Sequence, residues 1–260
     1  MGSTSWIVPG TLAQNLLRAA LDVDDMELVL FDTPEASNIP EPSEILELRD
    51  ISRDLGVTCS VHFPCELRPD VPESVERCLR VIERMAPLEP SGWVLHLVGE
   101  QRGDPPSRDM GAWLDWIEAA AGRVARALPI SRDLSVETLD YDFEWLDEAV
   151  EALDLSVCLD VGHLVRYGFP LSRTLDRLLP RTRILHLHGV KPDGTDHADL
   201  SHFEPRALMD LFERLEKGPE RIVTLEVFEE DFERSLEVLR GLGRPPGAGA
   251  GLDLRSERDT

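Results

Sequence analysis

The sequence of 260 residues predicts an α/β fold, a single (β/α)8 TIM barrel. Short apolar runs recur along the chain, and each is followed by a segment with helical periodicity, which is the pattern of a parallel sheet with crossover helices. Eight such runs are present, and several are almost entirely apolar, as strands buried on both faces must be. Eight strand and helix pairs within this length favour a closed barrel over an open doubly wound sheet.

Each element of the barrel can be placed along the chain. The strands are predicted at residues 4–9, 26–32, 57–64, 92–98, 133–139, 155–161, 183–190 and 222–228. Amphipathic helices are predicted at residues 43–56, 73–85, 109–128, 142–153, 171–179, 205–218 and 231–243. Nothing marks an internal boundary, so we expect residues 1–243 to form one catalytic barrel domain. The Pro/Gly-rich and then charged residues 244–260 are expected to form a disordered tail.

Composition excludes several classes of function. Fifty acidic residues against twenty-seven basic ones give a formal net charge of −23, which repels a phosphate backbone and argues against nucleic-acid binding. No run approaches the roughly 18 apolar residues of a membrane-spanning helix. The N-terminus has neither a basic segment nor a long apolar one, as a secretory signal would, so we expect a cytoplasmic protein without membrane or nucleic-acid partners.

The seven histidines all lie outside the predicted helices. They are His62 and His96 at the ends of the third and fourth strands, His163 after the sixth, His186 and His188 in the seventh, and His197 and His202 in the loop that follows. Because about half of randomly placed histidines would fall on helices in such a fold, this placement has odds of roughly one in a hundred. The pattern therefore indicates a shared function at the strand ends.

Three acidic residues occupy the same strand ends, namely Glu137, Asp160 and Glu226. An ionised carboxylate in an apolar strand needs a partner, because desolvating it alone costs several kcal/mol. In a TIM barrel the C-terminal strand ends meet at one mouth, where active sites are built. Imidazoles and carboxylates converging there predict a transition-metal site. We therefore expect Asp160 and His163 to be metal ligands rather than parts of a helix cap.

The chain resembles the xylose-isomerase-like TIM barrels, the superfamily that includes endonuclease IV and the sugar epimerases. The motifs "VHFP", "VLHLV", "VETLD", "LDVGH", "LHLHGVK…DHADLS" and "TLEVF" occur in the family order. The resemblance implies one divalent metal at Glu137, Asp160, His188 and Glu226, a second at His62, His96 and Glu137, and a third at His163 and His197, with Asp196 beside them. His186 lies two residues before His188 on the same strand face, so either can be the seventh-strand ligand, and we choose His188 as the nearer to the mouth.

Longer strings are similar to the cobamide-remodelling phosphodiesterases of this superfamily. They include "TSWIVPGTLAQNL", "VDDMELVLFDT" and "VHFPCELRP". The resemblance implies a metal-dependent hydrolase that cuts the phosphate linkage of the nucleotide loop of a cobamide, its small-molecule substrate. It also implies two or three divalent ions, zinc first, with manganese or iron compatible. On this interpretation Glu137 bridges two ions and holds a hydroxide, and Glu226 orients the water.

Two alternatives remain open at this stage. The first is a single-metal sugar or sugar phosphate isomerase or epimerase, in which Glu137 and Glu226 act as proton acceptor and donor on either face of a bound ketose. His62 and His96 would then have no role, and the metal content per chain separates this function from the phosphodiesterase. The second is a non-catalytic, metal-containing corrinoid- or sugar-phosphate-binding protein, although structural metal sites are usually closed and rich in cysteine.

Overall fold

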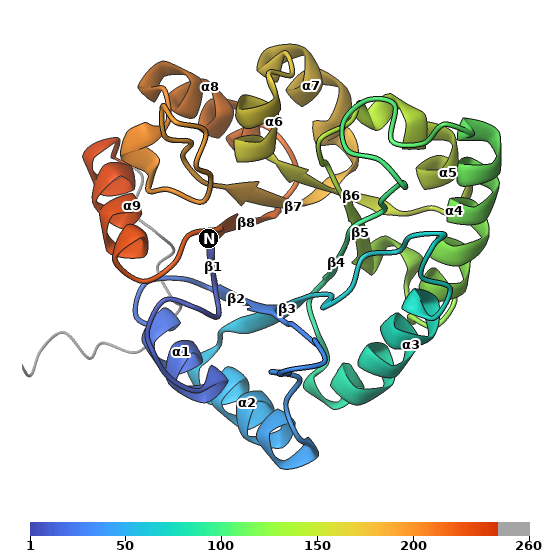
Figure 1. Ribbon diagram of the computed structural model, residues 1–260. Helices are drawn as coiled ribbons and strands as arrows, with labels where there is room; N and C mark the ends of the chain where they lie inside the picture. The colour runs from blue at the N-terminus through green and yellow to red at the C-terminus, as the bar shows by residue number, and fades with distance from the viewer. Residues whose placement is uncertain (244–260) are drawn as a thin grey trace, which may run out of the picture.

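The computed structural model describes residues 1–243 and contains a closed barrel of eight parallel strands that follow one another in chain order (Figure 1). The strands are β1 (Gly2–Thr4), β2 (Asp25–Val29), β3 (Thr58–His62), β4 (Trp93–Leu95), β5 (Leu134–Glu137), β6 (Ser156–Asp160), β7 (Thr182–Leu187) and β8 (Ile222–Leu225). The predicted fold class is confirmed. The predicted tail, residues 244–260, lies outside the described residues.

The helices form an outer ring around the barrel (Figure 1). They are α1 (Leu12–Ala19), α2 (Pro42–Leu55), α3 (Ser74–Met85), α4 (Met110–Ala125), α5 (Asp147–Ala152), α6 (Val161–Tyr167), α7 (Leu171–Leu178), α8 (Pro205–Glu216) and α9 (Glu230–Gly241). Short 3-10 turns, such as η5 (Leu200–His202), complete the connections. Among residues 1–243 no helix combines the length and the apolar character needed to cross a membrane.

The first strand is shorter and earlier than the predicted 4–9. Its pairing with β2 runs only from Gly2 to Thr4, because the chain then turns away from the sheet. The backbone amides of Ile7 and Val8 donate instead to Oδ1 of Asn15, at 2.9 and 3.0 Å. The side chain of Asn15 thus takes the place of a neighbouring strand, which an apolar pattern does not reveal.

Two helices lie where no helix is predicted. At the start of α1, the hydroxyl of Thr11 accepts the amide of Gln14, and the Gln14 side chain accepts the amide of Thr11. This capping box is the sequence signature of the helix start. The second helix, α6, follows β6 directly and carries His163 in its first turn, so the expectation that every histidine lies outside a helix is wrong for His163.

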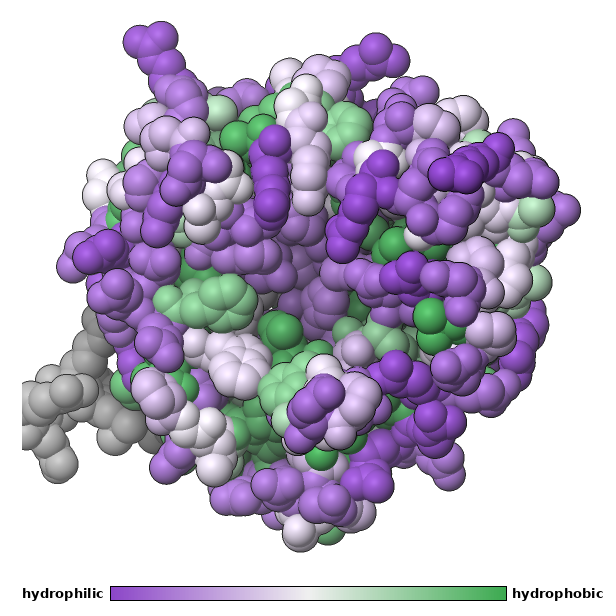
Figure 2. Space-filling view, in the orientation of Figure 1, coloured by the Kyte–Doolittle hydropathy of each residue, from purple (hydrophilic) through white to green (hydrophobic). Residues whose placement is uncertain are grey.

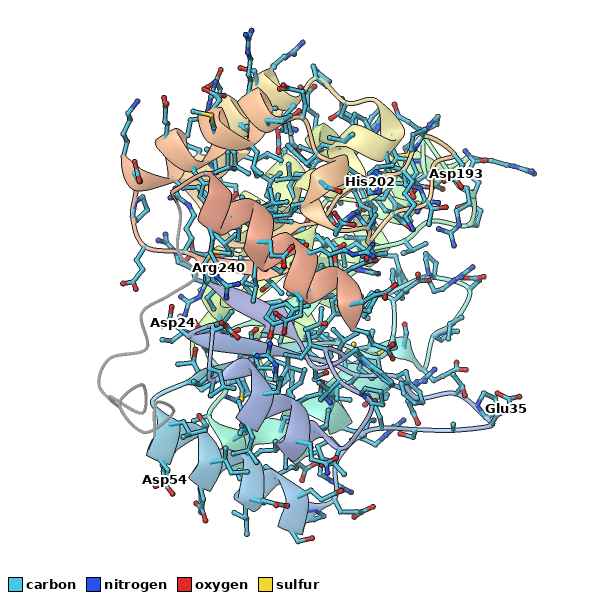
Figure 3. All side chains as sticks on the ribbon, turned by 90° about the vertical axis from the view of Figure 1, so that its left-hand side faces the viewer. Asp24, Glu35, Asp54, Asp193, His202 and Arg240 are labelled. Carbon is cyan, nitrogen blue, oxygen red and sulfur yellow. The ribbon has the colours of Figure 1, made fainter. Side chains whose placement is uncertain are left out.

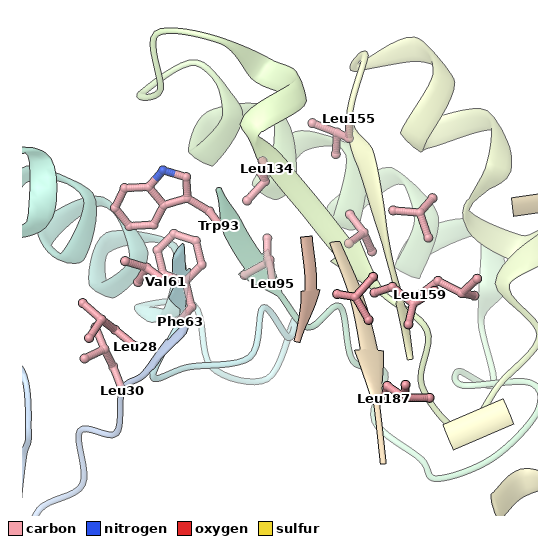
Figure 4. Close-up of a cluster of buried hydrophobic side chains, with 14 of the residues drawn as sticks. Leu28, Leu30, Val61, Phe63, Trp93, Leu95, Leu134, Leu155, Leu159 and Leu187 are labelled. Atoms are coloured by element: carbon pink, nitrogen blue, oxygen red, sulfur yellow. The ribbon is translucent and has the colours of Figure 1, made fainter. Parts of the chain in front are cut away.

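Successive side chains of each strand point alternately outward to the helices and inward to the barrel interior, and this alternation separates the core from the site. Leu28, Val61 and Leu159 face the helices and belong to the main hydrophobic core, part of which Figure 4 shows. Val94 and Cys158 have the opposite orientation and form a separate small cluster with Ile184 inside the barrel. Towards the carboxyl ends of the strands, the inward positions are polar, and these positions make the site.

Candidate metal centre

The site lies at the end of the barrel where the strands terminate. Figure 3 shows Glu35, Asp193 and His202, from loops that follow strands, at one end of the molecule, and Asp24 and Asp54, from segments that precede strands, at the other. Figure 2 looks onto the first of these ends and shows a hollow with a hydrophilic floor. The predicted ligands belong to this end because each one lies at the end of its strand or in the segment that follows the strand.

The three predicted carboxylates are all buried here. Glu137 is the last residue of β5, Asp160 is the last residue of β6, and Glu226 follows β8 directly. Their residues are 1%, 0% and 7% exposed, respectively. Three buried carboxylates at one mouth need compensating positive charge, and the surrounding imidazoles supply part of it.

His186 is the imidazole that faces all three carboxylates. Its Nδ1 lies 3.5 Å from Glu137 Oε2, 4.0 Å from Asp160 Oδ2 and 3.1 Å from Glu226 Oε2. The ring is fully buried, and its Nε2 lies 3.0 Å from Glu27 Oε2. We call Glu137, Asp160, His186 and Glu226 the four-residue set.

Unpartnered atoms show that the four-residue set fits a divalent cation. Within residues 1–243, Asp160 Oδ2, His186 Nδ1 and Glu226 Oε2 are buried side-chain atoms without a hydrogen-bond partner. Buried polar atoms normally have partners, so their concentration at one point requires an explanation. A cation bound between them would satisfy all three atoms at once. Carboxylate and imidazole ligands are those that manganese and zinc accept.

His188, the predicted seventh-strand ligand, lies beside this set rather than at its centre. Its Nε2 is 3.2 Å from Asp160 Oδ1. His188, Asp160 and Glu226 lie close enough together to hold one metal ion. The Nδ1 of His188 lies 3.1 Å from the carbonyl oxygen of Gly189 and 3.0 Å from the backbone nitrogen of His197. Of the two open choices, His186 is therefore the residue that meets Glu137 as well as the other carboxylates.

Asp160 has a second role that was not expected from the sequence. Its Oδ1 accepts the backbone amide of His163 at 2.7 Å and caps α6, so the expected choice between ligand and cap is wrong. A carboxylate has two oxygens, and Oδ2 stays without a hydrogen bond. One residue therefore starts the helix and also presents an oxygen to the four-residue set.

His62 and His96 face Glu137 from the neighbouring strands. Their Nε2 atoms lie 3.3 and 3.0 Å from Glu137 Oε2. The Nδ1 of His62 lies 3.1 Å from the carbonyl of Phe63, which can only accept a hydrogen bond, so Nδ1 donates and Nε2 is left to face Glu137. The structure thus brings together the residues predicted for a second metal.

A third group consists of His163, His188 and His197. His163 Nδ1 lies 3.0 Å from the carbonyl of Thr138, and His197 Nδ1 lies 3.1 Å from the carbonyl of Glu226. Oδ2 of the predicted Asp196 lies 3.9 Å from Nε2 of His197. Asp196 forms an ion pair with Arg166, from the last turn of α6, and it belongs to none of the metal-ligand groups among residues 1–243.

The comparisons with known proteins agree with the barrel fold. Residues 17–252 match the family described as the xylose isomerase-like TIM barrel. The chain belongs to this family. A comparison with curated proteins gives no match.

Solved structures extend the likeness of this xylose isomerase-like chain. A D-tagatose 3-epimerase-like protein has a TM-score of 0.72 at 19% identity and covers 92% of this chain and 95% of its own. The 3-keto-D-glucoside 4-epimerase from E. coli has a TM-score of 0.70 at 13% identity, with 93% and 98% covered. The protein TTHB071 from Thermus thermophilus, from a crystal soaked with ZnCl2, has a TM-score of 0.61 at 25% identity, with 88% and 89% covered.

These findings contradict the expected cobamide phosphodiesterase. The structural neighbours named for an activity include sugar epimerases, among them an L-ribulose 3-epimerase, and a sugar phosphate isomerase/epimerase. They match the alternative, an isomerase or epimerase, better than a hydrolase of cobamides.

The carboxylates of this family member change the acidity of the histidines around them. Burial lowers the pKa of His62, but the hydrogen bond and charge of Glu137 outweigh it and raise that pKa to about 9. Burial likewise lowers the pKa of His188, and the charge of Asp160 outweighs it, again to about 9. At neutral pH these imidazoles are therefore protonated and balance the buried carboxylates.

Zinc loading at pH 7 should consequently release protons. A metal ion binds the imidazole lone pair, so an ion that binds His62 or His188 must displace the proton that the pKa of about 9 keeps in place. We expect about one proton per such histidine, and less release above pH 9, where the proton has already left. A pH indicator in weakly buffered solution measures this, and zinc uptake without acidification would contradict it.

Gly162 leaves room for the His188 ring. A Cβ at position 162 would lie 2.1 Å from His188 Cε1, so the ring would have to move. Gly162→Ala should displace His188 and lower the free energy of unfolding by about 1–3 kcal/mol, measured by urea denaturation. Gly111→Ala, in α4, is the matched control, because the nearest atom to its Cβ is 3.7 Å away and we expect no loss there. Equal losses for both variants would contradict the packing argument.

Glu27 is the site residue that sequence reasoning missed. It is an acid inside the apolar run "MELVLFD", which is the same signal that identified Glu137 and Glu226. It was detectable by that rule, but it lies deeper in the barrel than a strand-end ligand. Its side chain is fully buried and contacts His186.

An aromatic flank, made of Trp6, Phe31 and Phe228, borders the mouth. The rings of Trp6 and Phe31 lie 5.8 Å apart, and Phe228 lies 5.6 Å from the ring of His197. Trp6 and Phe228 are 40% and 39% exposed. Figure 2 shows hydrophobic side chains along this side of the hollow. The mouth therefore offers an apolar wall next to a charged floor.

Proposed function

We propose that this chain is a metal-dependent isomerase or epimerase that acts on a sugar or sugar phosphate. The observation that carries the proposal is the position of two buried glutamates. Glu137 and Glu226 come from different strands, and both approach the same atom, His186 Nδ1, at 3.5 and 3.1 Å. The epimerases and isomerases among the structural neighbours support the same class of reaction.

This class of reaction moves a proton at a carbon atom next to a carbonyl group. A divalent ion held by the four-residue set would polarise the carbonyl and hydroxyl oxygens of the sugar and so make that proton more acidic. Glu137 and Glu226 would then accept the proton on one face and return it on the other. Burial of both glutamates keeps water away from the carboxylates while they do so.

One ion at the four-residue set is enough for this function. A set with three carboxylates suits manganese, whereas the histidine-rich groups around it suit zinc. The expectation of two or three ions stays a prediction, and metal analysis of the purified protein tests it.

Solvent exchange is the direct test of the function. The manganese-loaded protein is incubated in D2O with a panel of ketoses and ketose phosphates, and the products are analysed by NMR. We expect deuterium at the carbon next to the carbonyl group of at least one sugar, together with its epimer or isomer. Glu226→Gln should abolish the exchange because it removes one of the two proton-carrying groups. A loaded and folded protein that exchanges no proton in any sugar would overturn the proposal.

A further inference from the structure

We propose that Glu27 is a positioning residue that orients His186 for metal binding. Glu27 lies in β2 and His186 in β7, and the two are 159 residues apart in the sequence. Both side chains are fully buried inside the barrel. Glu27 Oε2 lies 3.0 Å from His186 Nε2, so the contact has hydrogen-bonding geometry.

The two ring nitrogens of His186 face different partners. Nε2 faces Glu27, and Nδ1 faces the carboxylates of Glu137 and Glu226. A carboxylate accepts hydrogen bonds, so Glu27 favours a proton on Nε2. With the proton held there, the lone pair of Nδ1 points at the place where the four-residue set would hold the ion. Without Glu27, the tautomer with a proton on Nδ1 would compete and block that direction.

In the described part of the chain, the side chain of Glu27 has no other hydrogen bond that would explain its position. Within residues 1–243 its Oε1 is a buried atom without a partner. A buried carboxylate is costly unless it is paired, so a single contact to His186 must account for its presence. Asp25, two residues earlier on the same strand, differs in this respect. Its carboxylate accepts hydrogen bonds from three hydroxyl groups, those of Thr58, Ser60 and Ser91.

The test measures manganese affinity, with the free ion detected by electron paramagnetic resonance, and it rests on the proposed metal set. Glu27→Met should weaken manganese binding 10- to 100-fold, about the usual effect of losing the carboxylate behind a metal-bound histidine. Glu27→Asp keeps the charge but shortens the side chain, so it should weaken binding as well. Glu27→Gln should retain part of the affinity, because its amide oxygen still accepts from Nε2. Thermal melting of the metal-free proteins confirms that each variant is folded.

Two further variants separate positioning from charge. Asp25→Asn removes a buried negative charge from the same strand without touching a histidine, and its manganese affinity should stay within about twofold of wild type. In a double-variant cycle, Glu27→Met should add no further loss to His186→Asn, because Glu27 acts through His186.

The outcomes are distinguishable. Unchanged affinity in Glu27→Met and Glu27→Asp, or additive losses in the cycle, would overturn this inference and leave the proposed function standing. A wild-type protein that binds no manganese would overturn both. If Glu27→Met does not fold, Glu27→Asp and Glu27→Gln decide the question.

Discussion

Glu137→Gln should leave the protein folded and lower kcat/KM about a thousandfold or more. Oε2 of Glu137 lies 3.3, 3.0 and 3.5 Å from nitrogens of His62, His96 and His186, so this one carboxylate serves three imidazoles. Glutamine keeps the shape of the side chain but removes its charge and proton affinity. The loss corresponds to several kcal/mol of transition-state stabilisation. Turnover of the sugar identified by solvent exchange measures it, and circular dichroism checks the fold.

His202→Ala is the control for this experiment. His202 is an exposed residue of η5, and it belongs to none of the metal-ligand groups among residues 1–243. We expect it to keep most of the activity and the metal. Turnover near the wild-type value in a folded Glu137→Gln variant would exclude a role for Glu137 in catalysis.

Trp113→Ala should have the largest effect on stability, with a loss of about 3–5 kcal/mol in the free energy of unfolding. Trp113 is 2% exposed in α4, and its Nε1 donates to the carbonyl of Val98 at 3.2 Å. Its ring packs edge-on against Tyr141, whose hydroxyl donates to the carbonyl of Leu97 at 2.6 Å. The substitution leaves a cavity, and it removes the hydrogen bond that holds Val98 in the segment after β4. Urea denaturation measures the loss.

Trp145→Ala provides a comparison of the same residue type. Trp145 is 40% exposed, and its Nε1 donates to Asp104 at the surface. We expect a loss of about 1 kcal/mol or less, because little buried surface and one solvent-accessible hydrogen bond are removed. Equal losses for the two tryptophans would contradict the assignment of Trp113 to the core.

The pattern of apolar runs was sufficient to predict the closed barrel. Strands buried on both faces must be apolar along their length, so each one can be recognised from a run of consecutive apolar residues. The start of the first strand was predicted less well, because the side chain of Asn15 accepts the amides of Ile7 and Val8 in place of a strand. A contact between a loop and a helix side chain leaves no periodic signal.

The sequence also identified Glu137, Asp160 and Glu226, because an acid in an apolar strand requires a partner wherever the strand lies. The motifs identified the family, but strings of this length did not identify the reaction. Family membership follows from residues that hold the barrel and its metal ligands, whereas the substrate is selected by loops whose shape depends on the whole fold.

Three-dimensional packing settled the remaining contacts of the site. His186 and His188 point to the same side of one strand, and only their depth in the barrel, with Glu27 behind His186, distinguishes them. Asp196 forms an ion pair with Arg166, which lies in the last turn of α6. The local sequence shows that a residue must have a compensating charge or must be buried. Which atom becomes its partner depends on residues far apart in the sequence, because only closure of the barrel brings these residues together.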